Sequence, residues 1–427
     1  MAYVVINALL YLALLLVYWK HKKVFDAGTL LICMWLVVAV AGVAYYLENP
    51  LSWRFQLWPF LFIFICFLLL SRYIFRYRFG EKAIYRLAYT KNRIIDILCW
   101  FYLICVVIKL INEGLNFSAL SLLQVAEDSA EAYEDHLSYE FQGGPIAYIA
   151  TVYVQYFSNA CIIWGFNCLC QSRKLSSFLF LFFPFISAFG EGIFYGSRNT
   201  IVMAVMVYIC AYVLYQKLIP RKSKIVIYIS SSVVGIIVLL YLLAIAESRF
   251  GIDTPASEDN SILAYLGQSM LQFNYGLADT IRGTYDGAMH FKNLYTLIDF
   301  SVPKRFSADS MLGTHISTGF VTIVGFFVMD FGYIGTTICC ILFPLLMKEI
   351  CFRPKGFTLP AMYIFLFYLT RMMRGSMVFS GPGADASYFF AIIFAVLLKI
   401  AMIMGALLFK DKKRVNKSIC YDTREFS

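Results

Sequence analysis

Long apolar runs separated by short polar segments extend over most of the chain. Runs of about 17 to 25 apolar residues are long enough to cross the hydrocarbon core of a membrane as helices. The pattern predicts eleven such spans, at residues 2–18, 28–47, 56–75, 94–111, 145–170, 176–190, 200–216, 225–246, 332–347, 358–373 and 386–408. We therefore expect an all-α polytopic membrane protein that forms a single helical membrane domain over residues 1–427.

Two segments are too long to be simple connectors between these spans. Residues 112–144 form an acidic outer loop without Lys or Arg, and residues 247–331 form a large outer loop. In the larger loop, apolar residues spaced by three and four over 262–281 predict an amphipathic, interfacial helix at the membrane surface. Residues 316–329 are apolar but short and are broken by Gly, which is typical of a re-entrant helix.

Composition and charge then give the protein an orientation. The chain is 61% apolar and 15% charged, whereas soluble domains carry about a quarter charged residues. Its Lys- and Arg-rich loops all fall on the cytoplasmic side if the amino terminus is outside and the carboxyl terminus is cytoplasmic, as the positive-inside rule requires. The net charge of +10 therefore reflects topology. Cations scattered over many short loops do not form a nucleic-acid-binding patch, so we expect a lipid bilayer and no nucleic acid as partner.

The cations on the predicted outer face are mostly Arg. The planar fork of Arg holds phosphate and carboxylate groups through two hydrogen bonds, which suggests that this face recognises an anion. Arg side chains that reach toward lipid headgroups would give the same bias, so both interpretations stay open at this point.

No metal or cofactor is expected from the sequence. Its Cys residues fall in predicted spans or on the inner side, and the Cys pair in residues 167–170 has neither the spacing nor the His partner of a zinc site. The acidic loop also lacks a recognisable ligand spacing. Asp330 begins the tripeptide DFG, but the Gly-rich loop and HRD motif of a kinase do not accompany it.

Two short motifs give the chain a family resemblance. The sequence "GSRNTI" opens one predicted span, and "DFGYIG" opens another after the large outer loop. Together with the hydropathy plan of nearly the whole chain, the motifs at 196–198 and 330–335 resemble the Wzy-type oligosaccharide repeat unit polymerases that make O-antigen and capsule.

This resemblance implies an enzyme of the bacterial inner membrane that works at its outer face. It would transfer a growing glycan from its undecaprenyl pyrophosphate carrier onto an undecaprenyl-pyrophosphate-linked oligosaccharide repeat unit, as a membrane glycosyltransferase. A flippase and a chain-length regulator would be its partners. Related O-antigen ligases share the plan and use a different acceptor.

The resemblance also assigns roles to the outer charged residues. Negative charge develops on the leaving pyrophosphate, and prepositioned Arg side chains are its natural stabilisers. The candidates for pyrophosphate binding are Arg198, Arg249, Arg282, Arg371 and Arg374. The acceptor hydroxyl must give up or share its proton as it attacks the anomeric carbon, and the candidates for this base are Glu247, His315 and Asp330. Glu191 is interpreted as a local partner of Arg198.

Transport is the competing function, because a flippase or exporter of lipid-linked oligosaccharide also has many spans and charged outer loops. The chain shows no matching pair of halves, and Lys399 is central in its span, whereas Lys109 lies near an end. A structural or receptor-like membrane protein is a third interpretation.

Overall fold

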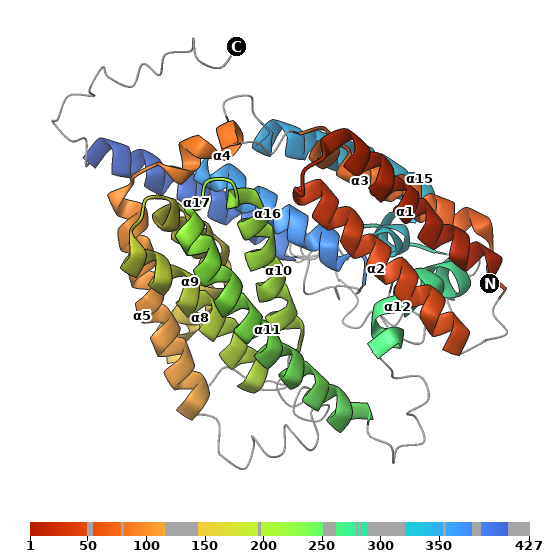
Figure 1. Ribbon diagram of the computed structural model, residues 1–427, viewed down its shortest axis with the longest axis horizontal. Coiled ribbons are helices and arrows are strands. Elements are labelled where there is room, and N and C mark those ends of the chain that lie inside the picture. Colours follow the sequence, from red (N-terminus) through yellow and green to blue (C-terminus); the bar gives the residue numbers. More distant parts are fainter. Residues whose placement is uncertain are drawn as a thin grey trace, which may run out of the picture.

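The structure is a computed structural model that describes residues 1–48, 54–77, 81–115, 144–194, 198–250, 262–278, 281, 283–287, 321–352, 356–377 and 386–408. Within these ranges the chain forms helices and no strand (Figure 1), which confirms the prediction of an all-α polytopic protein. One helix coincides with each predicted span: α1 (Ala2–Lys22), α2 (Ala27–Glu48), α3 (Leu57–Arg76), α5 (Arg93–Leu115), α8 (Gly144–Cys170), α9 (Lys174–Phe194), α10 (Arg198–Tyr215), α11 (Arg221–Phe250), α15 (Ile323–Cys351), α16 (Leu359–Arg374) and α17 (Ala386–Leu408).

The helices differ in how well they satisfy the length of a membrane span. Among the described residues, eight are long and apolar enough to cross a membrane by length and composition: α1, α2, α3, α5, α8, α9, α15 and α17. Helix α10 is apolar but shorter. Helix α16 has 16 residues, about 24 Å at 1.5 Å per residue, which is less than the roughly 30 Å of a hydrocarbon core. A helix this short ends inside the bundle unless its neighbours are equally short.

Aromatic side chains fill the contacts between the first three helices. Tyr11 of α1 lies 5.8 Å from Trp35 of α2 and 5.5 Å from Phe67 of α3, measured between ring centroids. Trp35 and Phe67 are closer still, at 4.6 Å. All three rings are fully buried, so the α1–α2–α3 group is fixed by close ring packing.

Helix α16 lies at the centre of the described bundle. It packs against α2 and α15 on one side and against α8, α10 and α17 on the other, and it lies between these two groups in Figure 1. Its amino-terminal end carries a Pro in the first turn, where the missing N–H is not needed. Most of its side chains are buried, so its few partly exposed residues are candidates for a functional site.

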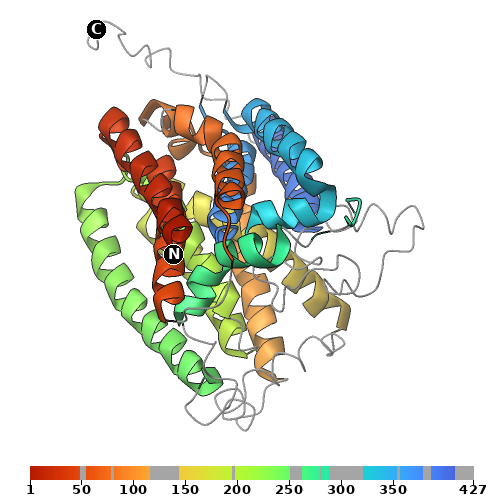
Figure 2. The same ribbon diagram turned by 90° about the vertical axis from the view of Figure 1, so that its right-hand side faces the viewer.

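Helix α11 lies on the outside of the bundle, since it crosses the front in Figure 1 and forms the left-hand edge in Figure 2. Its apolar side chains are open over much of the described part, with Val226, Ile229 and Ile236 between 59% and 64% exposed. An apolar helix that is exposed in this way is suited to a lipid environment. The hydroxyl groups of Tyr212 on α10 and Tyr228 on α11 are 2.7 Å apart and link the two helices.

The helix predicted over 262–281 is present as α12 (Ile262–Gln272), followed by a π-helical segment, Phe273–Leu277. Its inner face packs on α2, where Gly42 and Gly267 allow the two backbones to approach closely. Met270 and Phe273 are buried as well. The part of the apolar face that Met270 and Phe273 form is therefore covered by the protein.

Candidate functional site

Two cations lie near the carboxyl end of α16, on the least buried face of the helix. Arg371 and Arg374 are three residues apart in the last turn and are partly exposed, whereas Met372 and Met373 between them are buried. Phe367, one turn earlier on the same face, is also partly exposed, and its ring centroid lies 5.2 Å from the guanidinium carbon of Arg371. The stacked ring restricts the directions that the Arg371 guanidinium can take.

Neighbouring elements hold this end of α16 through its backbone carbonyls. The indole Nε1 of Trp35 donates to the carbonyl of Met372 at 3.0 Å. The hydroxyl of Ser269 on α12 donates to the carbonyl of Ser376 at 2.7 Å, and the backbone N–H of Ile323 donates to the carbonyl of Gly375 at 2.7 Å. The carbonyls near the end of a helix lack helical partners. Here α2, α12 and α15 supply hydrogen-bond donors to three carbonyls at this end of α16, and these bonds fix the position of the two Arg residues.

The two Arg residues lie part of the way along the bundle and not at its edge. Trp35, which binds the end of α16, packs against Phe67, ten residues after the first residue of α3 and so about 15 Å along it. The hydroxyl of Tyr368 donates to the carbonyl of Leu70 at 2.6 Å, still further along α3. The cations at the end of α16 therefore lie near the middle of α3. Charges at such a position are functional candidates by default.

Helix α15 has two halves that meet at Gly332. This residue has φ 65° and ψ −177°, a conformation that is essentially restricted to Gly. The first half begins at Ile323, against Gly375, and the second half begins beside the first turns of α3, where Tyr333 packs on Trp58 and Phe62. The first half is thus a short helix that starts beside Gly375 and runs to the level where α3 begins.

The segment 283–287 replaces the hydrogen bonds that the break removes. The backbone N–H of Tyr285 donates to the carbonyl of Met329 at 3.0 Å, and that of Gly287 donates to the carbonyl of Asp330 at 3.1 Å. In an unbroken helix these carbonyls would accept bonds from residues 333 and 334. Backbone groups at this depth need a partner. The large loop therefore stabilises the break that the sequence "DFG" encodes.

Asp330 is fully buried, with 0% of its surface exposed. Of the three predicted base candidates it is the one whose side chain the structure describes. Glu247 lies in the last turn of α11, but its side chain is outside the description, and His315 lies outside the described residues altogether. The structure brings Asp330 to the kink of α15, next to the segment that follows Arg282.

The predicted anion-binding residues divide in the same way. The structure brings Arg371 and Arg374 together on one face of α16. Arg198 is the first residue of α10 and Arg249 is in the last turn of α11, but the side chains of both are outside the description. Arg282 falls outside the described residues.

The predicted pairing of Glu191 with Arg198 falls outside the description, because the Arg198 side chain is not described, and the structure gives Glu191 two other partners. Its Oε2 accepts a hydrogen bond from Nζ of Lys109 on α5 at 2.6 Å, and its Oε1 accepts one from the hydroxyl of Thr200 at 3.2 Å. Lys109 also lies 3.6 Å from Glu113 and 3.4 Å from the hydroxyl of Ser187. Sequence reasoning missed this cluster. The spacing of Lys109 and Glu113 by four residues was a usable signal, whereas the contact with Glu191 depends on how α5 and α9 pack.

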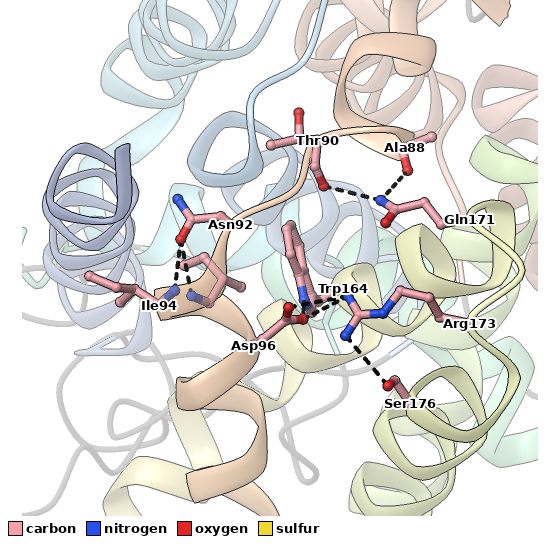
Figure 3. A network of polar contacts seen from close by, with 10 residues as sticks. Ala88, Thr90, Asn92, Ile94, Asp96, Trp164, Gln171, Arg173 and Ser176 are labelled. Carbon is pink, nitrogen blue, oxygen red and sulfur yellow. Dashed lines mark hydrogen bonds and ion pairs between the residues drawn. The ribbon is translucent and has the colours of Figure 1, made fainter. Parts of the chain in front are cut away.

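A second polar network ties the opposite end of α5 to the turn between α8 and α9 (Figure 3). Asp96 accepts hydrogen bonds from Nη1 of Arg173 at 2.9 Å and from Nε1 of Trp164 at 2.8 Å. Gln171 donates to the carbonyls of Ala88 and Thr90. On the predicted topology this end is cytoplasmic. The nitrogen donors of Trp164, Gln171 and Arg173 all find acceptors within it, so it is interpreted as a structural network.

Comparison with known proteins places these features in a family. A family model described as "Putative O-antigen polymerase" matches residues 146–371, which is more than half of the chain. The match extends from the first turn of α8 to Arg371 and includes the start of α10, helix α12 and the break in α15. No curated protein and no solved structure matches the chain. The chain belongs to the O-antigen polymerase family, as its short motifs and hydropathy plan predict.

Proposed function

We propose that this protein polymerises lipid-linked oligosaccharide repeat units at the outer face of the bacterial inner membrane. A hydroxyl of the acceptor repeat unit attacks the anomeric carbon of the donor glycan, and a glycosidic bond forms. The bond between that carbon and the undecaprenyl pyrophosphate oxygen breaks, the pyrophosphate leaves with the electron pair, and the hydroxyl proton passes to a base or to water. Membership of the O-antigen polymerase family supports the polymerase role.

The observation that carries the proposal is the pair of Arg residues at the end of α16. Helix α16 is mostly buried, yet Arg371 and Arg374 are partly exposed residues near the middle of α3. Two cations held by a fixed helix end suit a ligand with two adjacent phosphates, because developing negative charge is best stabilised by donors that need not move. Cations that only marked a membrane boundary would lie at the ends of the bundle.

Arg198 extends the proposed pyrophosphate site from a second helix. It is the first residue of α10, where unpaired backbone N–H groups and the helix dipole favour an anion. Arg249 on α11 and Arg282 are the further candidates. We assign Arg371 and Arg374 to the leaving pyrophosphate and Arg198 to the same group or to the pyrophosphate of the acceptor lipid.

The base is assigned among three residues. Asp330 is closed off from solvent, so in this conformation it is suited to holding the kink and not to meeting a sugar hydroxyl. Glu247 and His315 are the candidates that the large loop supplies. A base within hydrogen-bond reach of the acceptor hydroxyl contributes about 10²- to 10⁴-fold to such a transfer, so either substitution should leave a measurable residual rate.

The function is tested in a strain that lacks the gene. Loss of the polymerase should leave surface glycan of a single repeat in place of a ladder, and wild-type protein should restore the ladder. Arg371→Lys keeps the charge but loses the fork, so it should reduce polymer at unchanged protein level. The matched control is Arg72→Lys, since Arg72 also stacks on a ring, that of Tyr73 at 4.6 Å, but lies far along α3. Repeat units that accumulate on the cytoplasmic side would instead indicate a flippase.

A further inference from the structure

The cluster around Lys109 is unusual because it places two buried ionisable groups, Lys109 and Glu113, beside a partly exposed carboxylate, that of Glu191. The side chains of Lys109 and Glu113 are 4% and 5% exposed, and that of Glu191 is 35% exposed. One ammonium thus faces two carboxylates, of which Glu191 is the closer at 2.6 Å. Among the described residues, Oε2 of Glu113 has no hydrogen-bond partner. Burying charged groups costs free energy, so a buried cluster of this kind is a candidate for a role that depends on its geometry.

The hydrogen bonds of Glu191 connect three helices at one point. Lys109 belongs to α5, Glu191 to α9 and Thr200 to α10. Glu191 and Thr200 lie on the two sides of the α9–α10 connection, and Thr200 is two residues after Arg198. A rotation of the first turn of α10 would break the contact between Thr200 and Glu191. The carboxylate therefore fixes the orientation of the turn from which the Arg198 side chain leaves.

We propose that Lys109 and Glu191 are positioning residues that hold the first turn of α10 through Thr200 and thereby aim Arg198 at the anionic substrate. The inference rests on the proposed function, because it requires Arg198 to bind that substrate. Lys109 fixes the carboxylate, the carboxylate fixes Thr200, and the helix carries the constraint over two residues to Arg198. Binding groups must be held within a fraction of an ångström of their productive geometry, and supporting residues provide this.

The most direct test removes the hydrogen bond from Thr200 to Glu191 and leaves no buried charge without its partner. Thr200→Val is nearly isosteric and removes the hydroxyl that donates to Glu191, and Thr200→Ser restores a hydroxyl. Thr90→Val is the matched control, because the Thr90 hydroxyl donates only to a carbonyl of its own segment, that of Arg86 at 2.6 Å, at the opposite end of α5. Each variant is compared at equal protein level for polymer yield and for the apparent melting temperature of purified protein.

We expect Thr200→Val to reduce polymer about tenfold, the effect of a misplaced binding group of order 1.4 kcal/mol. Thr200→Ser and Thr90→Val should resemble the wild type, and melting temperatures should stay similar. In an Arg198→Lys background the further effect of Thr200→Val should shrink, because both changes act on the same contact. A merely structural role would lower the melting temperature and would act equally in both backgrounds.

Lys109→Met tests the interaction through which Lys109 fixes the Glu191 carboxylate. Removing the ammonium leaves two neighbouring carboxylates, so this variant should lose polymer and also protein level, and Lys109→Arg should recover part of both. Polymer equal to wild type in Thr200→Val would overturn the positioning role even if Arg198→Ala abolishes polymer. A normal ladder in Arg198→Ala would instead overturn the assignment of Arg198 to the substrate, so the two failures are distinguishable.

Discussion

Replacing Gly332 by Ala tests the break in α15. At φ 65° and ψ −177° a residue with a Cβ atom is strained by about 1–3 kcal/mol. The strain is in the backbone, because a Cβ at this position would have ordinary contact with Thr284, whose Cγ2 would be 3.4 Å away. The kinked state should therefore lose a factor of roughly 5 to 150 relative to other conformations.

The competing conformation is a straight helix. Ala favours a helix interior over Gly by about 1 kcal/mol, and a straight α15 would rebuild the bonds from residues 333 and 334 to Met329 and Asp330. Tyr285 and Gly287 would then lose the carbonyls that they bind at 3.0 and 3.1 Å. The first half of α15 would also move away from Gly375. Gly332→Ala should therefore reduce polymer and lower the apparent melting temperature together.

The assay measures polymer ladders in the deletion strain and thermal unfolding of the purified protein in detergent. Gly235→Ala is the matched control, because Gly235 lies within α11 and a Cβ there would meet no atom within 4 Å. That change should be neutral or stabilise by up to about 1 kcal/mol. If Gly332→Ala and Gly235→Ala give the same ladders and melting temperatures, the kink is not a strained, Gly-dependent structure.

Three further predictions concern packing, the inner network and topology. Gly267→Ala would place a Cβ 2.5 Å from the backbone of Ala41, so overpacking of about 1–3 kcal/mol should lower the melting temperature; an unchanged temperature would refute the α2–α12 contact. Asp96→Ala removes the acceptor of Arg173 and Trp164 and should destabilise by about 1.5–3 kcal/mol, while polymer per molecule of folded protein stays near wild type. Lys174→Cys, at an exposed position of the α8–α9 turn, should react with an impermeant thiol reagent only in permeabilised cells; labelling of intact cells would reverse the proposed topology.

The sequence was sufficient for the helices because the membrane imposes their length and apolarity locally. Each predicted span coincides with a helix. The Gly residues within 316–329 were expected to break the short helix, whereas the structure places the break in α15 at Gly332, the first residue of the next predicted span. The apolar spacing over 262–281 likewise predicted a helix. It did not identify what covers the apolar face of that helix, since a bilayer surface and a neighbouring helix such as α2 favour the same spacing.

The candidate site shows the same limit. Charge patterning selected Arg371 and Arg374, and the structure shows that they share a face near the middle of α3, at the end of a central helix. The charge pattern could not identify Lys109 as a partner of Glu191, because 82 residues separate the two in the chain. Ion pairs between helices depend on which faces pack together, and nothing local in the sequence determines that.

By itself, then, the sequence determined the helical class, the positions of the spans and the family, because hydropathy and short motifs are properties of contiguous residues. Only the tertiary structure decided where in the bundle the end of α16 lies, how the segment 283–287 satisfies the broken backbone of α15, and that Lys109, Glu191 and Thr200 meet at the start of α10. Each of these depends on contacts between residues far apart in the chain, which form only when the helices have packed.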